Sequence, residues 1–419
     1  MRMKFLSSVF AAMLFLPLMA VEFSIKTDKD MPVYKCGEAM KFTFSATENG
    51  VPVKSDICKA EFLFCGRKVL KSIPVDFSLG KPVDLDFTLD VPGFILVRLV
   101  DSKGVMVKNG KKAVYSGAAF EPEKIRKYYA VPDDFITFWE SGCKAVADNP
   151  VVLTKDEKRS NDKYTLYYVS VKSLNDETIT GYLSVPVGEG KYPALVTVPG
   201  AGQGISGPAG YAASGVITLS MNVHKFPTAD NSTEQARRYK EDIKTGTYAY
   251  RGAGDRDKYF FRSVYVAVNH AINYVAAMKE YDGKHMVFDG SSQGGGSALI
   301  LAGLNKNITA LAANVPALCD HGGFRAGRGS GWPQLFNRPD PDKYAPYFDA
   351  ANFASLINVP ALVSCGFLDT TCPPSTVYAA FNELKGEKVM IHVPLEGHTV
   401  SQIYQKEKVK FVRKHLGLE

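Results

Sequence analysis

The pattern of apolar and polar positions divides the chain into two parts. Residues 21–117 contain short alternating runs, such as 39–46 with Phe42 and Phe44 on one face, followed by 59–64, 83–89 and 93–100. Asn49-Gly50 and Asn109-Gly110 supply turn signals between such runs. Short strands with this spacing are typical of an all-β sandwich, so we predict a small immunoglobulin-like sandwich domain here. It is either a carbohydrate-binding or docking module or, as we favour, a structural cap on the next domain.

After a predicted linker at 118–131, the pattern over 132–419 alternates between strands and helices. A helix is expected from Pro132, capped by Asp133 or Asp134, with Phe135, Phe138 and Trp139 on one buried face. A long amphipathic helix follows at 259–279. Predicted strands occupy 164–173, 179–185, 194–197, 215–219, 286–288, 308–314, 360–365 and 388–393. The first two form an antiparallel edge pair, and the rest predict an α/β fold with a doubly wound, mostly parallel sheet.

The first residues have the composition of a secretory signal. Arg2 and Lys4 precede an apolar run over 5–19, and Ala20 offers a small residue at a cleavage point. We therefore expect residues 1–20 to be a signal peptide and the mature protein to be exported, either periplasmic or secreted. No Cys follows the cut, and no second apolar run is long enough to span a bilayer, so we expect no membrane anchor.

Cysteine and charge patterns narrow the function classes. The seven cysteines leave at least one unpaired, and Cys58 with Cys65, or Cys365 with Cys372, are close enough in sequence to bridge. The pairing itself stays open. The net charge of +7 is modest and its basic residues are scattered, which argues against a nucleic-acid partner. No Cys-x-x-Cys or His-rich cluster suggests a metal, and no cofactor is expected.

One motif indicates chemistry. The apolar run 286–288 leads into Gly290-Ser291-Ser292-Gln293-Gly294, and an Ala/Leu-rich helix is predicted over 297–304. Strand, Gly-x-Ser-x-Gly and helix form the context of a nucleophile elbow, in which the central serine stands clear at the end of a strand. Ser292 is therefore the candidate nucleophile.

A serine nucleophile needs a base, and the base needs an orienting carboxylate. In α/β-hydrolases the chain order is serine, acid, histidine. His398 follows the last predicted strand, and Asp369 follows the strand before it. His392 lies inside a strand and is interpreted as structural, and Asp289 is interpreted as a turn residue.

The developing oxyanion of acyl transfer needs two backbone donors. One comes from the residue after the nucleophile, and the other from the loop after an earlier strand. Here these are the amides of Gln293 and of Ala201, in Pro199-Gly200-Ala201.

Residues 132–419 resemble the acetyl xylan esterase/cephalosporin-C deacetylase family of α/β-hydrolases. The stretches that carry the resemblance are 132–139, Tyr248-Ala249-Tyr250-Arg251-Gly252, the elbow 292–294 and the acid-loop pattern 366–376. The resemblance implies Ser292, Asp369 and His398 as the triad, and removal of acetyl groups from sugars and small esters without a metal. The chain departs from the family pattern at 199–201, 223–225 and 398–399.

The sequence thus predicts an exported serine esterase that deacetylates an oligo- or polysaccharide of the xylan type. An esterase for another acyl group such as feruloyl, a serine peptidase, and a non-catalytic glycan-binding protein are the alternatives. A homo-oligomer is left open. The polar segment 225–258 is either part of the pocket rim or an uninvolved surface loop.

Overall fold

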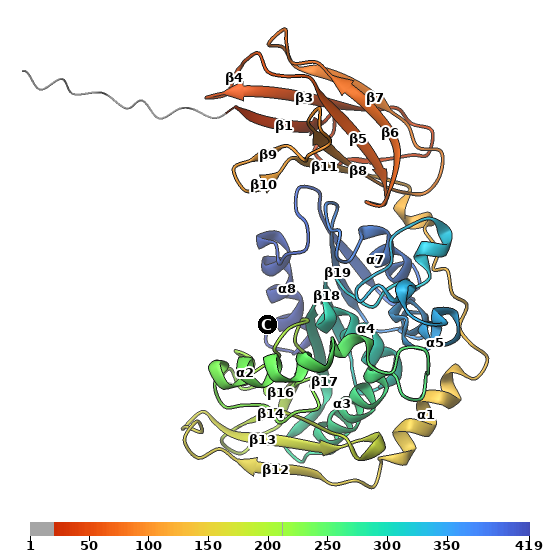
Figure 1. The fold of residues 1–419 in the computed structure, drawn as a ribbon. Coiled ribbons are helices and arrows are strands. Elements are labelled where there is room, and N and C mark those ends of the chain that lie inside the picture. The colour runs from red at the N-terminus through yellow and green to blue at the C-terminus, as the bar shows by residue number, and fades with distance from the viewer. Residues whose placement is uncertain (1–20, 212) are drawn as a thin grey trace, which may run out of the picture.

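The computed structural model describes residues 21–211 and 213–419, and the predicted signal peptide lies outside these ranges. It shows an all-β domain standing at one end of an α/β domain (Figure 1). The all-β domain has a four-stranded sheet, a five-stranded sheet and a small hairpin. Its strands are β1 (Glu22–Thr27), β2 (Val33–Tyr34), β3 (Met40–Glu48), β4 (Val51–Pro52), β5 (Cys58–Phe64), β6 (Lys68–Val75), β7 (Val83–Phe87), β8 (Gly93–Val100), β9 (Lys108–Asn109), β10 (Lys112–Ala113) and β11 (Tyr115–Phe120).

Aromatic side chains fill the space between the two larger sheets. Phe42 and Phe44 of β3 are fully buried, as the alternation of that strand predicts, and Phe62 of β5 stacks on Phe87 of β7. β11 pairs with β8 through Phe120. The last strand of the sandwich therefore continues three residues into the stretch predicted as a linker.

The α/β domain is built on a nine-stranded sheet in the order β12-β13-β14-β16-β15-β17-β18-β19-β20. The strands from β16 to β20 run parallel, and the β12, β13 and β14 edge is antiparallel. Their bounds are β12 (Val151–Lys155), β13 (Tyr164–Lys172), β14 (Thr178–Pro186), β15 (Tyr192–Thr197), β16 (Ile217–Met221), β17 (Tyr281–Ser291), β18 (Ala310–Asn314), β19 (Ala361–Gly366) and β20 (Lys388–Val393). The predicted mostly parallel sheet is confirmed, with β12 as an additional edge strand that the sequence did not indicate.

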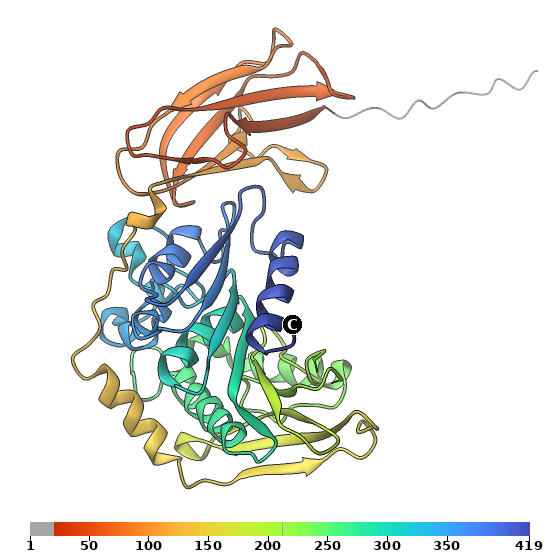
Figure 2. The same ribbon diagram turned by 180° about the vertical axis from the view of Figure 1, so that it is seen from behind.

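Helices cover both faces of this sheet (Figure 2). On one face, α8 buries Tyr404 and Val412 against Leu195 and Val287 of the sheet. The other face carries the larger core, which includes Trp139, Val264 and Leu299. The helices are α1 (Phe135–Ala145), α2 (Ser232–Asp242), α3 (Phe260–Ala276), α4 (Gln293–Leu304), α5 (Pro341–Phe348), α6 (Ala350–Ala354), α7 (Pro374–Phe381) and α8 (Gln402–His415), with short 3-10 turns η1 (Pro122–Lys124), η2 (Leu174–Asp176), η3 (Ile243–Thr245), η4 (Tyr248–Tyr250), η5 (Gly323–Ala326) and η6 (Leu335–Asn337).

The start of α1 differs in one detail from the expectation. Asp134 occupies the position before the helix, but its side chain accepts no hydrogen bond from the helix backbone. It is paired instead with Arg256 and with the hydroxyl of Tyr347, which joins α1 to distant parts of the domain. Trp139 is core, as predicted, because its ring is buried and its Nε1 donates to the carbonyl of Tyr347 at 3.0 Å.

The bridges considered from cysteine spacing are not formed. All seven cysteines lie in the described residues, and each is a free thiol. Cys58 begins β5 and Cys65 follows its end. An extended strand advances about 3.3 Å per residue, so the two thiols are held far apart.

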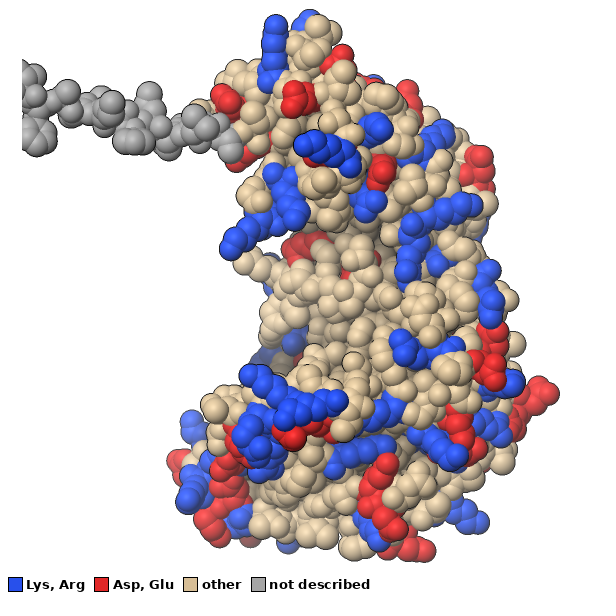
Figure 3. All heavy atoms as spheres, in the orientation of Figure 1, with Lys and Arg blue, Asp and Glu red and all other residues tan. Residues whose placement is uncertain are grey.

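Surface charge and helix length bear on partners. Basic and acidic side chains are intermingled over both domains on the face in Figure 3, with a basic group over α2 that is partly paired with Glu234 and Glu241. That face has no continuous basic stripe of the kind that binds nucleic acid. Within the described residues, no helix has the length and hydropathy needed to cross a bilayer.

Candidate active site

Ser292 lies on a sharp turn between β17 and α4. Its backbone has φ 56° and ψ −119°, a conformation that a side-chain-bearing residue adopts only when its surroundings impose it. Two flanking glycines make this turn feasible. A Cβ on Gly290 would lie 2.2 Å from the carbonyl oxygen of Gly294, and a Cβ on Gly294 would lie 2.1 Å from that of Val198. The Gly-x-Ser-x-Gly spacing therefore reflects close backbone packing around Ser292.

The structure brings Ser292, His398 and Asp369 together from three separate segments. Nε2 of His398 lies 2.8 Å from Oγ of Ser292, and Nδ1 lies 2.7 Å from Oδ2 of Asp369. A carboxylate only accepts, so Nδ1 carries the proton and Nε2 presents its lone pair to the serine hydroxyl. This is the tautomer that a general base requires.

Asp369 is held by the loop between β19 and α7, the acid loop 367–373. Its Oδ1 accepts the backbone N–H groups of Thr371 and Cys372, both at 2.8 Å, while its Oδ2 faces His398. The Asp369 side chain is only 1% exposed and that of His398 is 26% exposed. Backbone hydrogen bonds therefore fix the orientation of the buried carboxylate, whereas the imidazole is partly exposed to solvent.

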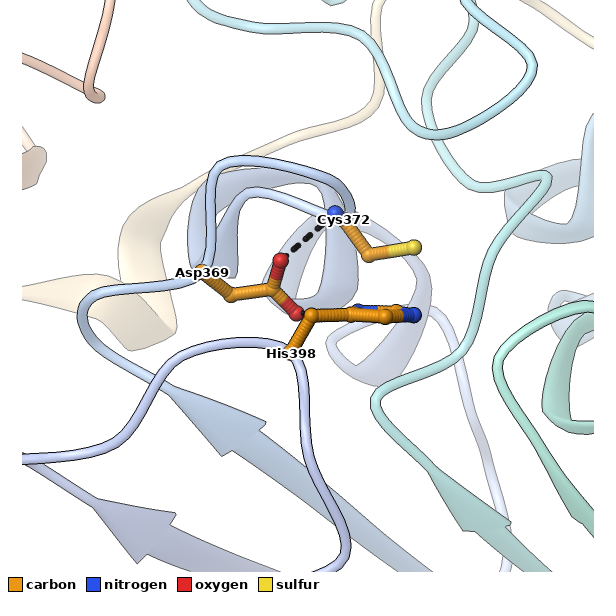
Figure 4. A group of neighbouring side chains, drawn as sticks. All are labelled: Asp369, Cys372 and His398. Atoms are coloured by element: carbon orange, nitrogen blue, oxygen red, sulfur yellow. Dashed lines mark hydrogen bonds and ion pairs between the residues drawn. The ribbon is translucent and has the colours of Figure 1, made fainter. Parts of the chain in front are cut away.

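The side chains of Asp369, Cys372 and His398 form a group whose ligand atoms lie within 4.8 Å of one another (Figure 4). The chemistry of these three side chains fits a metal ion poorly. Both carboxylate oxygens of Asp369 are already occupied by protein donors, and burial raises the pKa of the Cys372 thiol well above its ordinary value. A thiol must lose its proton to ligate a metal, so these residues fit a hydrogen-bonded triad better than a cation site.

Of the two predicted oxyanion donors, Gln293 follows Ser292 directly and Ala201 follows Gly200, which lies close to Ser292. Gln293 begins α4, where the first backbone N–H groups have no acceptor within the helix. Gly200, in the loop after β15, approaches so closely that its Cβ would lie 3.9 Å from Cβ of Ser292. Ala201 follows on the exposed side of this loop, the oxyanion loop 199–204.

A buried network behind the oxyanion loop was not predicted from the sequence. Tyr248 donates its hydroxyl to Oε1 of Gln293 at 2.6 Å, and Nε2 of Gln293 donates to the carbonyl of Pro199 at 3.2 Å. Nε2 of His224 lies 2.8 Å from the carbonyl of Gly202. Burial lowers the pKa of His224, so the ring stays neutral and donates from Nε2. These side chains hold the loop by its carbonyls.

The segment 225–258 takes part in this network. Gln235 of α2 donates to the carbonyl of Gln203 at 2.6 Å, and the ring of Tyr239 packs 5.3 Å from that of His224. The segment therefore supports the oxyanion loop, which decides against an uninvolved surface loop. Tyr248 could have indicated this network from the sequence, because it belongs to the stretch 248–252 that resembles the acetyl xylan esterase family.

Two polar residues near the triad have other roles. Asp289 lies within β17, not in a turn as interpreted, and pairs with Lys408 of α8 at 3.0 Å. Burial raises the pKa of Asp289, and the lysine charge opposes that shift. His392 stacks on Tyr378 and is hydrogen-bonded to its hydroxyl, which agrees with the structural role predicted for it.

The turn, the parallel sheet and the order of the three side chains along the chain place this protein among the α/β-hydrolases. Solved structures agree on the fold. Acetyl xylan esterase 1 from Thermoanaerobacterium superposes with a TM-score of 0.58 at 22% identity, covering 70% of this chain and 97% of that one. The acetyl xylan esterase from Paenibacillus sp. R4 gives 0.57 at 24% identity, covering 71% and 99%.

Sequence comparison assigns the family. The family model described as acetyl xylan esterase (AXE1) matches residues 120–325 and 343–416. The acetyl esterase Axe7A of Xylanibacter ruminicola is 32% identical over 390 residues, which cover 87% of this chain and 84% of that protein. The chain belongs to the acetyl xylan esterase family and is a carboxylic ester hydrolase.

Proposed function

We propose that this protein is an exported serine esterase that removes acetyl groups from carbohydrate esters of the xylan or xylo-oligosaccharide type. The observation that carries the proposal is the continuous hydrogen-bond chain from Asp369 through His398 to Ser292. Membership of the acetyl xylan esterase family supports the acetyl and xylan parts of the proposal.

In the first half of the reaction, Oγ of Ser292 attacks the ester carbonyl carbon and its proton passes to Nε2 of His398. The tetrahedral oxyanion accepts hydrogen bonds from the amides of Gln293 and Ala201. When the carbon–oxygen bond to the sugar breaks, His398 returns the proton to the departing sugar oxygen. An acetyl group then remains on Ser292.

In the second half, His398 takes a proton from a water molecule that attacks the acetyl-enzyme. The second tetrahedral intermediate collapses, acetate leaves, and the proton returns to Oγ of Ser292. Asp369 stays ionised and stabilises the imidazolium that forms twice in each cycle.

The test compares wild type with Ser292→Ala on 4-nitrophenyl acetate, butyrate and ferulate, together with acetate release from acetylated xylan. Acetate-selective turnover that Ser292→Ala abolishes supports the proposal. A preference for ferulate indicates another acyl group, and turnover that survives in Ser292→Ala rejects the site. A glycan-binding protein without turnover would bind xylan equally well in both forms.

Export rests on residues 1–20, so its test is separate. Expression of the full chain in a Gram-negative host, followed by cell fractionation, is expected to place the processed protein in the periplasm or medium. Intact protein that keeps residues 1–20 in the cytoplasm would contradict export.

A further inference from the structure

The turn between β5 and β6 of the sandwich lies against the acid loop. Cys65 and Gly66 both have positive φ, 48° and 70°, within the three-residue loop 65–67, and the amide of Cys65 donates to the carbonyl of Phe94 at 2.7 Å. Cys65 is buried within the core of the α/β domain. A Cβ on Gly66 would lie 3.9 Å from Cγ2 of Thr370, the residue after Asp369. The tip of this hairpin is therefore in contact with the loop that holds the carboxylate.

Phe94, at the start of β8, packs on the same loop from beside the hairpin. Its ring is 5.1 Å from that of Phe367 in an edge-to-face arrangement and 5.7 Å from that of Tyr378 in α7. Edge-to-face pairs prefer a defined geometry, so this contact orients the backbone two residues before Asp369. A cavity of about 10 Å³, near the lower limit for one water molecule, lies between the hairpin turn, Phe94 and Asp369.

Gly117 of β11 makes the third contact. A Cβ at this position would lie 3.1 Å from both Cβ of Phe367 and Cδ2 of Leu368, so the strand backbone packs directly on the acid loop. The amide of Leu368 donates to the carbonyl of Glu396 at 3.1 Å, and a Cβ on Gly397 would lie 3.3 Å from the carbonyl of Leu368. Leu368 thus lies between the sandwich and the segment that ends in His398.

We propose that the N-terminal sandwich is a positioning part of the active site: Phe94, the Cys65–Gly66 turn and Gly117 hold the acid loop so that Asp369 orients His398. The proposal rests on the triad of the proposed function and gives the sandwich a role in every turnover. Figure 1 shows the geometry that makes this feasible, with the sandwich standing over β19 and α7, the elements on either side of the acid loop.

A carbohydrate-binding role for the sandwich leads to a different expectation. A binding module changes the KM for polymeric xylan and leaves turnover of a small ester unaffected, because 4-nitrophenyl acetate does not extend beyond the serine. A positioning role changes kcat for both substrates, because a misplacement of about 1 Å in a catalytic group costs on the order of 100-fold.

The experiment compares Phe94→Ala with Phe62→Ala in the full-length protein. Both phenylalanines are buried in the sandwich, but Phe62 packs on Phe42 and Phe87 in its interior, away from the acid loop. Assayed well below its thermal midpoint, Phe94→Ala is expected to lose about tenfold or more in kcat on 4-nitrophenyl acetate, with KM nearly unchanged. Phe62→Ala is expected to keep wild-type kcat, and Phe94→Leu to recover part of the loss.

Equal kcat values in folded Phe94→Ala and wild type would overturn the proposal, as would an equal loss in Phe62→Ala. If Phe94→Ala does not fold, Gly117→Ala tests the proposal instead. This substitution removes no side chain from the core, and its added methyl group displaces Phe367 of the acid loop. Its kcat is expected to fall about threefold or more, and an unchanged kcat would overturn the proposal. Ser292→Ala, assayed in parallel, separates the two claims: activity that survives in it rejects the triad itself.

Discussion

The hydroxyl of Tyr248 donates a 2.6 Å hydrogen bond to Oε1 of Gln293, the residue whose backbone amide is a candidate oxyanion donor. Through its Nε2, the same glutamine side chain holds the carbonyl of Pro199 in the oxyanion loop. The Gln293 side chain therefore links the two segments that carry the candidate oxyanion donors, and Tyr248 fixes its orientation.

We expect Tyr248→Phe to lower kcat about tenfold with little change in KM. The substitution leaves Oε1 of Gln293 buried without its donor, which costs about 1–3 kcal/mol and frees the side chain to reorient. Initial rates with 4-nitrophenyl acetate measure the effect. Tyr250→Phe is the matched control, because its hydroxyl bonds to the carbonyl of Pro333 and not to Gln293. Equal rates for the two variants would remove Tyr248 from the site.

Asp369→Asn is expected to reduce kcat by about 10³-fold or more while the protein stays folded. The amide oxygen still accepts from Thr371 and Cys372, but the amide nitrogen then faces Nδ1 of His398 and favours the wrong tautomer. Turnover of 4-nitrophenyl acetate and the thermal midpoint are the two measurements. A loss of less than tenfold would show that Asp369 does not orient the base.

Gly294→Ala is expected to lower the free energy of unfolding by more than about 3 kcal/mol or to prevent folding. Its new Cβ would lie 2.1 Å from the carbonyl oxygen of Val198, the residue after β15. Gly207→Ala is the control, since nothing lies within 4 Å of its Cβ. Chemical denaturation of both variants tests the point. If Gly294→Ala were as stable as Gly207→Ala, the backbone around the elbow would have room for a Cβ at position 294, against the close contact with Val198.

Stability is expected to fall as the pH is lowered from 7 to 5, partly because of His321. Burial lowers the pKa of this histidine to about 3, whereas an unfolded chain has an ordinary value of about 6.5. Between these values only the unfolded state binds the proton, so acid favours unfolding by up to about 1.4 kcal/mol per pH unit.

Thermal midpoints of wild type and His321→Gln across this pH range provide the measurement. His321→Gln is expected to show a shallower decline than wild type. Identical curves for wild type and His321→Gln would assign the acid sensitivity to other groups.

Local patterns predicted most of the α/β domain because periodicity and turn signals depend on residues that are neighbours in sequence. The glycines around Ser292 indicated a turn that only small residues tolerate, and the structure shows the backbone atoms that a side chain would meet. Asp369 and His398 were found by their positions after successive strands, since parallel strands bring their carboxyl ends to one edge.

The features missed from the sequence depend on partners far away in the chain. β12 is a short, half-exposed edge strand whose pairing with β13 gives it its structure. Asp134 was predicted as a possible helix cap, but its carboxylate binds Arg256 and Tyr347 and not the helix backbone. Cys58 and Cys65 are close enough in sequence to form a disulfide, but the extended strand β5 lies between them and separates their thiols.

Periodicity, glycine spacing and strand order were enough to predict an α/β-hydrolase domain, its elbow serine and the two residues after later strands that the structure brings next to this serine. These depend on steric rules that act over a few residues. The contact of Phe94 with Phe367 and the link from Tyr248 through Gln293 to Pro199 could come only from the tertiary structure. These contacts join residues that are far apart in the sequence. Many side chains could form such contacts, and only the packing of the two domains and of the buried polar network determines which side chains meet.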